Sequence, residues 1–198
     1  VSPLADATSV AVFRLVAEGN QALRAGDLAT AQRRFTDALA RDPTLVSAEL
    51  GLAFCAYQLD EGAEARRRVR AVLANQPSQP QAISLRGLLN LQEGKLSAAL
   101  ADTARAVELD PGDAQLRKFH GIVLQAGQRT EQALDEMREA ARLNPEDGET
   151  LLNLAILLAR RDPPQPAEAR RYYEQALAAG QPREPKLDEL LERLKEIP

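Results

Sequence analysis

The sequence predicts an all-α solenoid of paired helices, and three observations support this prediction. Ala and Leu make up one third of the 198 residues and aromatic residues only 4%, a composition that favours helices. No stretch alternates apolar and polar residues in the way that a half-buried strand does. Small residues and prolines recur with a period of 34 residues, which indicates a chain of repeated units.

The 34-residue period appears in five series that stay in phase with one another. The series are Pro43, Pro77, Pro111 and Pro145; Gly19, Ala53, Gly87, Gly121 and Ala155; Ala31, Ala65, Ala99 and Ala133; Ala38, Val72, Ala106 and Ala140; and Phe35, Val69, Thr103 and Met137. A fifth unit keeps the spacing at Ala169, Tyr173 and Ala176, with two extra residues in the segment 161–166. Because that segment is rich in proline, we expect the insertion to lengthen a loop without interrupting a helix.

Each unit is expected to form two antiparallel helices that cross at small residues, because a large side chain there would hold the backbones apart. The first helices are predicted at about 8–25, 44–59, 79–93, 112–126 and 146–160, and the second helices at about 28–41, 62–75, 96–109, 130–143 and 165–179. Glycines with positive φ are expected in the turns within the units, at Gly26, Gly62, Gly94 and Gly127. Between units, Asp42-Pro43, Asp110-Pro111 and Asn144-Pro145 predict an N-cap followed by proline at the first helical position.

One more helix is predicted at the C-terminal end, within residues 184–197. Its leucines, Leu187, Leu190, Leu191 and Leu194, form one stripe, and Glu and Lys cover the other side. A stack of repeats needs a terminal element with a polar outer face, so this helix is expected to cap the stack. Docking to a partner is the alternative role for it.

These units resemble the tetratricopeptide repeat (TPR), a 34-residue helix–turn–helix unit. The matching residues are Leu15, Gly19, Ala31, Phe35, Ala38 and Pro43 in the first unit, Ile83, Gly87, Ala99, Ala106 and Pro111 in the third, and Leu151, Ala155, Ala169, Tyr173 and Ala176 in the fifth. The repeats are expected at about 8–43, 44–77, 78–111, 112–145 and 146–182, with 1–7 as a lead-in and 183–198 as the capping helix. The second unit departs most, because its register could rest on Gly51 or on Ala53, and Glu49 stands at a usually apolar position.

The resemblance implies a right-handed superhelix whose first helices line a concave groove, and a non-enzymatic module that binds a segment of a partner protein there. Helix geometry and the family pattern together place these residues on the groove face: Val16, Asn20, Leu50, Phe54, Tyr57, Leu85, Leu88, Lys118, Phe119, Ile122, Leu152, Asn153 and Ile156. The middle of this face is apolar and its edges are polar, which suits an apolar or amphipathic segment. The alternative is that these side chains pack within the stack and expose little. Leu85→Glu or Phe119→Glu is expected to abolish binding if the face is a groove.

Two specialised binding modes of similar proteins are not predicted. A clamp for the C-terminal carboxylate of chaperones uses a set of Lys, Asn and Arg residues, of which only Asn20 has a match here. The asparagine ladder of O-linked N-acetylglucosamine transferases would need an asparagine in every unit, and the equivalent series holds only Asn153.

The side chains that carry chemistry are too few to predict an enzyme, a cofactor or a metal site. One Cys and one His are present, and Cys55 and His120 both lie on predicted helices where a packing role is expected. A net charge of −4 argues against nucleic acid as the partner. The arginine run 66–70 is expected to be a solvated convex face, with docking of an acidic partner as the alternative. The longest apolar run, Leu151–Ala159, is too short to span a membrane and is interrupted by Asn153.

The expected partner is therefore a protein or peptide, and two other functions stay open. One is a structural scaffold or oligomerisation subunit of a bacterial assembly, such as one in the envelope, in which the apolar face pairs with a second copy. The other is the TPR arm of a larger enzyme. Low Lys with high Arg and Ala suggests a GC-rich bacterial source. The start at Val1 without Met leaves room for a removed signal or anchor, so bacterial cytoplasm and periplasm both stay open as locations.

Overall fold

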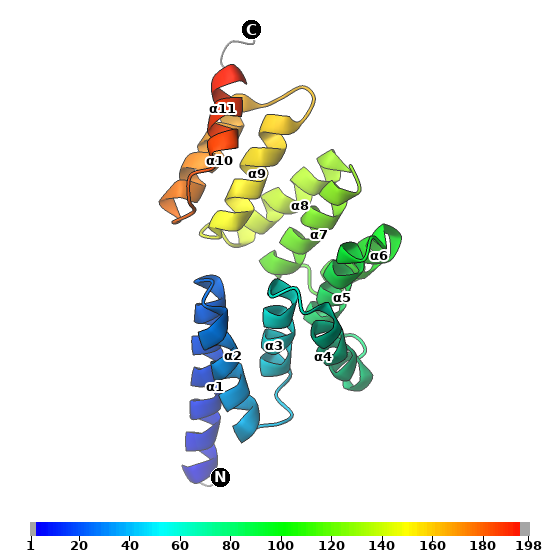
Figure 1. Cartoon of the computed structure of the whole chain (residues 1–198), viewed down its shortest axis with the longest axis vertical. Coiled ribbons are helices and arrows are strands. Elements are labelled where there is room, and N and C mark those ends of the chain that lie inside the picture. Colours follow the sequence, from blue (N-terminus) through cyan, green and yellow to red (C-terminus); the bar gives the residue numbers. More distant parts are fainter. Residues whose placement is uncertain (1–2, 195–198) are drawn as a thin grey trace. The chain divides into compact units, whose positions relative to one another are not determined.

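The computed structural model describes the backbone of residues 3–194 and the side chains of residues 10–194, and within those residues it contains helices and no strand. The helices are α1 (Pro3–Arg24), α2 (Leu28–Arg41), α3 (Val46–Gln58), α4 (Gly62–Asn75), α5 (Pro80–Gln92), α6 (Leu96–Leu109), α7 (Ala114–Ala126), α8 (Thr130–Leu143), α9 (Gly148–Arg160), α10 (Pro166–Ala178) and α11 (Pro185–Arg193). The predicted order of five helix pairs and one further helix is confirmed (Figure 1). The first helix begins at Pro3, earlier than the predicted start near residue 8.

The chain divides into two compact units, Val1–Glu93 and Gly94–Pro198. The division falls in the connection between α5 and α6, which is the turn of the third predicted helix pair. Unit 1 therefore contains α1 to α5, and unit 2 contains α6 to α11.

In unit 1 the pairs α1/α2 and α3/α4 are hairpins, and α2 packs on α3 as α4 packs on α5 (Figure 1). Phe35 of α2 is fully buried at the centre of the first hairpin and its neighbour. A Cβ atom added at Gly19 of α1 would lie 2.7 Å from the Phe35 ring, and one added at Gly51 of α3 would lie 2.5 Å from it. The ring therefore needs a glycine on both flanking helices. Ala53 is also fully buried, so the second repeat, at about residues 44–77, uses both of the small residues on which its register could rest.

In unit 2 the hairpins are α7/α8 and α9/α10, with α6 against α7 and α8 against α9. Leu134, Met137, Leu154 and Leu158 form the centre of its core and are fully buried. The two-residue insertion lies in the connection between α9 and α10, so it lengthens a loop as predicted.

The last helix, α11, packs against α9 and α10, as the capping prediction requires. Leu187 and Leu191 are buried on its inner side. Tyr173 of α10 accepts a hydrogen bond through its Oη atom from the Glu184 backbone N–H at 2.7 Å. Arg170 of α10 pairs with Glu192 at 3.3 Å, and polar contacts thereby reinforce the apolar docking of the cap.

The junctions between successive 34-residue repeats differ from the sequence prediction. Asp42 is the C-cap of α2, and its carboxylate accepts a hydrogen bond from the Thr44 backbone N–H. The next helix begins only at Val46, so Pro43 lies in a turn and is not the first helical residue. The prediction was wrong because proline here stops the preceding helix, which it cannot continue, and three more residues are needed to reverse the chain. At the third junction the N-cap is Asp113, which accepts from the Gln115 and Leu116 N–H groups.

The turns within the hairpins also differ in part. Positive φ angles occur at Gly26 (74°), Asp60 (60°), Gly94 (73°) and Gln128 (58°), and these positions are 34 residues apart. The left-handed position is therefore a property of the repeat, and glycine occupies it in only two of these four turns. Gly62 lies two residues after this position and Gly127 one residue before it, and both lack the positive φ that was predicted for them.

Candidate partner-binding site

In unit 1 the predicted groove residues lie on α1, α3 and α5 and differ in exposure. Val16 of α1 is half-buried and Asn20 is exposed. The α3 residues Leu50, Phe54 and Tyr57 are all half-buried, and the Phe54 and Tyr57 ring centroids are 5.9 Å apart. On α5, Leu85 and Leu88 are buried, with 4% and 2% of their surface exposed.

Exposed apolar side chains also lie on α1 and directly after α3. Phe13 of α1 is 70% exposed and Val10 is 68% exposed, and Leu59 follows directly after α3 with 43% exposed. Among the residues with described side chains, these are the large hydrophobic side chains classed as exposed. Unit 1 thus presents a partly exposed apolar surface on α1 and α3, which contact each other.

In unit 2 the predicted groove residues lie on α7 and α9. Ile122, Leu152, Asn153 and Ile156 are half-buried. Phe119 is 9% exposed, so it is part of the packed interior more than of the surface. The aliphatic members of the half-buried group pack against the unit 2 core with one side and leave the other side accessible.

Lys118 of α7 is the one charged member of the predicted groove set, and it is buried, with 7% exposed. Its Nζ atom lies 2.7 Å from a Glu149 carboxylate oxygen and 3.1 Å from an Asp147 carboxylate oxygen. Burial alone would lower the pKa of Lys118, but the attraction of Glu149 and Asp147 outweighs it and raises the pKa. The same contact lowers the pKa of Asp147, against the opposing effect of its burial. Lys118 therefore joins α7 to the start of α9.

Replacing Lys118 with methionine keeps the length of the side chain and removes its charge. We expect the free energy of unfolding at pH 7 to fall by about 1 kcal/mol, because Asp147 stays partly buried without its cation. Asp147 has a lowered folded pKa, so its contribution is complete above its unfolded pKa of about 3.9 and is lost as the pH falls through the folded value. The difference between the wild type and Lys118→Met should therefore shrink below about pH 4. Urea unfolding at several pH values measures this, and Lys186→Met, at an exposed lysine of α11, is the control.

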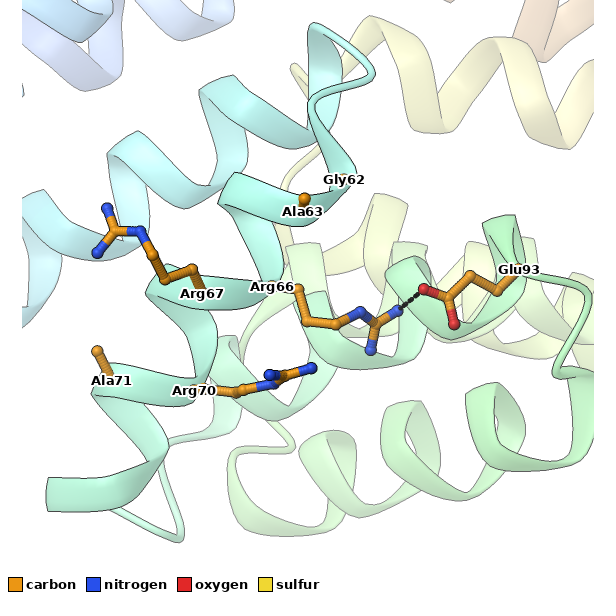
Figure 2. A pocket seen from close by; sticks show the side chains of 7 residues that line it. All are labelled: Gly62, Ala63, Arg66, Arg67, Arg70, Ala71 and Glu93. Atoms are coloured by element: carbon orange, nitrogen blue, oxygen red, sulfur yellow. Dashed lines mark hydrogen bonds and ion pairs between the residues drawn. The ribbon is translucent and has the colours of Figure 1, made fainter.

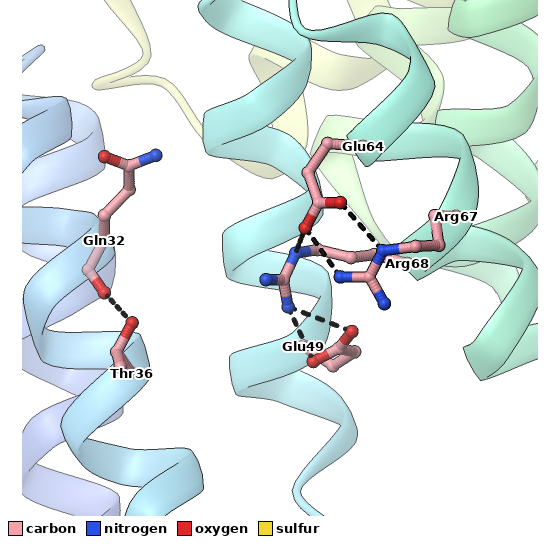
Figure 3. A network of polar contacts seen from close by, with 6 residues as sticks. All are labelled: Gln32, Thr36, Glu49, Glu64, Arg67 and Arg68. Carbon is pink, nitrogen blue, oxygen red and sulfur yellow. Dashed lines mark hydrogen bonds and ion pairs between the residues drawn. The ribbon is translucent and has the colours of Figure 1, made fainter.

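A second polar network connects α3 to α4 (Figure 3). Arg68 of α4 contacts both Glu49 carboxylate oxygens, at 3.0 and 3.1 Å, and also Glu64 at 2.7 Å. Arg67 binds Glu64 with two hydrogen bonds, of 2.7 and 2.8 Å. The hydrogen bond from Arg67 is the main cause that lowers the pKa of Glu64 to about 2. Glu49, at an unusual polar position for the repeat, is therefore paired with an arginine of its own hairpin.

The α7/α8 hairpin contains the same pair with the charges exchanged. Arg117 of α7 contacts Glu136 of α8 at 2.9 Å, and the two residues are 19 apart, as Glu49 and Arg68 are. Because Glu49 and Arg117 are two repeats apart, both pairs occupy equivalent positions. A charged pair thus occupies this point in two of the hairpins.

An open hollow of about 810 Å³ lies beside α4 and the end of α5 (Figure 2). Gly62, Ala63, Arg66, Arg67, Arg70, Ala71 and Glu93 line it. Arg66 donates to Glu93 at 2.6 Å and to the Asn90 Oδ1 atom at 3.4 Å. The arginine run could be identified from the sequence but this site could not, because Glu93 is the C-cap of the following helix and nothing local in the sequence links it to Arg66.

Cys55 and His120, the one Cys and the one His of the chain, both take part in packing. Cys55 is fully buried, and burial raises the pKa of its thiol to about 11. Burial also lowers the pKa of His120, whose Nδ1 atom lies 2.9 Å from Thr103 Oγ1. Because that hydroxyl also donates to the Ala99 carbonyl at 2.9 Å, it accepts from an Nδ1–H of the imidazole. Within the described residues, no three His, Cys, Asp or Glu side chains are grouped so that they could hold a metal ion.

Antiparallel helix pairs that repeat every 34 residues, with a small residue at each crossing, define the chain as a helical-repeat solenoid protein. Two family models described as tetratricopeptide repeat match residues 22–89 and 120–184. The chain belongs to the tetratricopeptide repeat family. Neither match is to a catalytic family.

Solved structures match the fold of this chain. TTC0263, described as a thermophilic TPR protein of Thermus thermophilus, matches with a TM-score of 0.70 and 21% identity over 92% of this chain and 98% of that chain. Pseudomonas aeruginosa pilF matches with a TM-score of 0.68 and 21% identity over 96% of this chain and 86% of that chain. YrrB, described as a TPR protein with an unusual peptide-binding site, matches with a TM-score of 0.53 and 18% identity over 92% and 91% of the two chains. At these identities the likeness concerns the fold.

No curated protein sequence matches the chain. In the part of the chain that the structure describes, none of the helices has the length and apolar character needed to cross a membrane.

Proposed function

We propose that the chain binds an apolar or amphipathic segment of a partner protein on the exposed faces of its first helices. The observation that carries this proposal is the apolar surface of unit 1, where Phe13 of α1 is largely exposed and Val16 of α1 and Phe54 and Tyr57 of α3 are half-buried. Aromatic side chains that are partly exposed can fill pockets of a partner with little loss of conformational entropy. In unit 2, Ile122, Leu152 and Ile156 offer a smaller surface of the same kind.

Charged side chains on α1 favour a different protein as the partner over end-to-end stacking of copies of this chain. Arg14 stands at the position of the repeat where the four later repeats have Ala48, Ala82, Leu116 and Thr150, all buried. Arg14 contacts Glu18 at 2.9 Å, and Glu18 contacts Arg34 of α2 at 3.1 Å. A charged edge of this kind resists further stacking, as the capping helix does in unit 2.

The proposal is tested with peptides selected on the immobilised chain from a displayed library of random peptides. We expect selected peptides to carry apolar residues at helical spacing, and Phe13→Glu or Ile156→Glu to weaken their binding by about 10-fold or more, as measured by fluorescence anisotropy. These residues are better targets than Leu85 and Phe119, whose burial means that a glutamate would also disturb the fold. Ala40→Glu and Ala101→Glu, at exposed positions of second helices, are the controls. Equal affinity in all variants would refute the proposal.

A further inference from the structure

We propose that the hollow beside α4 is a second docking site, which takes carboxylate side chains of an acidic segment of a partner protein. The site is separate from the apolar surface of the first helices, since three of its lining residues are arginines of α4, a second helix. It thereby adds to the proposed function a surface of different chemistry.

The three arginines that line the hollow differ in the direction in which they extend and in their ion-pair partners. Arg66 and Arg70 are one helical turn apart on α4 and extend toward the end of α5, whereas Arg67 extends the other way (Figure 2). Glu93 holds Arg66 in place, and Glu64 holds Arg67. Arg70 is exposed and forms no ion pair or hydrogen bond with any residue that the structure describes. The side of the hollow toward α5 therefore has two guanidinium groups and one carboxylate.

The second observation is that the hollow reaches the N-terminal end of α4. Gly62 and Ala63, in the first turn of this 14-residue helix, line it, and the N-cap residue Glu61 makes no side-chain hydrogen bond to the helix. First-turn N–H groups and the positive end of the helix dipole both favour an anion. Small side chains at Gly62, Ala63 and Ala71 leave room for a ligand to approach the helix.

A carboxylate is the anion that fits this arrangement best. A guanidinium binds a carboxylate with two parallel hydrogen bonds, and Arg70 is free to do so while Arg66 is already oriented by Glu93. Nucleic acid fits less well, because the chain has a net charge of −4 and no aromatic residue lines the hollow for stacking of bases.

The test is a titration of the whole chain, at low ionic strength, with a labelled peptide of six glutamates that is blocked at both ends. We expect Arg70→Ala to weaken its binding about 5-fold, with a strong dependence on salt. Arg41→Ala removes the same charge from an exposed arginine at the end of α2 and should change binding by less than about 2-fold. In spectra of the arginine Nε–Hε groups, the signals of Arg66 and Arg70 should move the most.

Several outcomes would overturn the proposal. Equal weakening by Arg70→Ala and Arg41→Ala would show attraction to net charge alone, and equal binding of a hexaglutamine peptide would exclude a role for carboxylates. Tighter binding of a six-residue thymidylate strand would assign the hollow to nucleic acid instead. Phe13→Ser should weaken the peptides selected on the apolar surface and leave the glutamate peptide unaffected, so failure of one proposal is distinguishable from failure of the other.

Discussion

Replacing Gly51 with alanine is expected to lower the free energy of unfolding by about 3 kcal/mol, the largest effect of a single methyl group in unit 1. The new Cβ atom would lie 2.5 Å from the Phe35 ring, which is fully buried and is also confined by Gly19 on the opposite helix. The ring cannot move away without a shift of α1 or α3. The gain in helix propensity on replacing glycine, about 1 kcal/mol, is too small to compensate.

Urea unfolding followed by circular dichroism measures this change, and the chain contains its own controls. Gly62→Ala adds a methyl group where no atom lies within 4 Å, so it should be neutral or slightly stabilising. Gly121→Ala would meet the flexible side chain of Met137 at 3.0 Å and should change stability by less than about 1 kcal/mol. Adding Phe35→Leu to Gly51→Ala should restore part of the loss. If the Gly51→Ala and Gly62→Ala variants had the same stability, the Phe35 ring could not lie between Gly19 and Gly51.

Reversing the charge of Glu49 is expected to lower the free energy of unfolding by about 2 kcal/mol. In Glu49→Arg, two guanidinium groups would face each other at a half-buried position, where Glu49 and Arg68 are now 3.0 Å apart. The double variant Glu49→Arg/Arg68→Glu places the charges as they are in the equivalent pair of unit 2, Arg117 and Glu136. It should therefore recover more than half of the loss, although Glu64 then faces a second carboxylate.

The coupling energy of this double-mutant cycle is the quantity to measure, again by urea unfolding. Arg41→Glu reverses the charge of an exposed arginine and should change stability by less than about 0.5 kcal/mol, so it serves as the control. A coupling energy near zero would mean that the two residues do not act as a pair.

The helix pairs, their order and the capping helix could be predicted from the sequence because the 34-residue period fixes which residues must be small. The ends of the helices could not. Asp42-Pro43 has the same sequence signature as an N-cap followed by proline, and only the length needed to reverse the chain shows that it ends α2 instead. The left-handed residue was predicted at Gly62 and Gly127, although Asp60 and Gln128 hold that position. Glycine is a strong signal for positive φ, but the repeat geometry imposes that angle on other residues as well.

The predicted groove residues lie on α1, α3, α5, α7 and α9, but their exposure could not be read from the sequence. Leu85 and Leu50 look equivalent as apolar residues on first helices, yet the first is buried and the second is half-buried. The partners of Lys118 are the N-cap Asp147 and the first-turn residue Glu149 of the next first helix, 31 residues away in the case of Glu149, so its burial depends on packing between hairpins. The hollow at Arg66 and Arg70 depends in the same way on Glu93, the C-cap residue of another helix.

Chemical-shift mapping by NMR shows directly whether the first helices carry the partner-binding surface. Backbone amide signals of the chain would be followed while a peptide selected on the chain is added. We expect the largest changes around Phe13 and Phe54 in unit 1 or around Ile156 in unit 2, with small changes at Ala40 and Ala101 of the second helices. Changes concentrated on second helices, with the signals around Phe13, Phe54 and Ile156 unmoved, would contradict it.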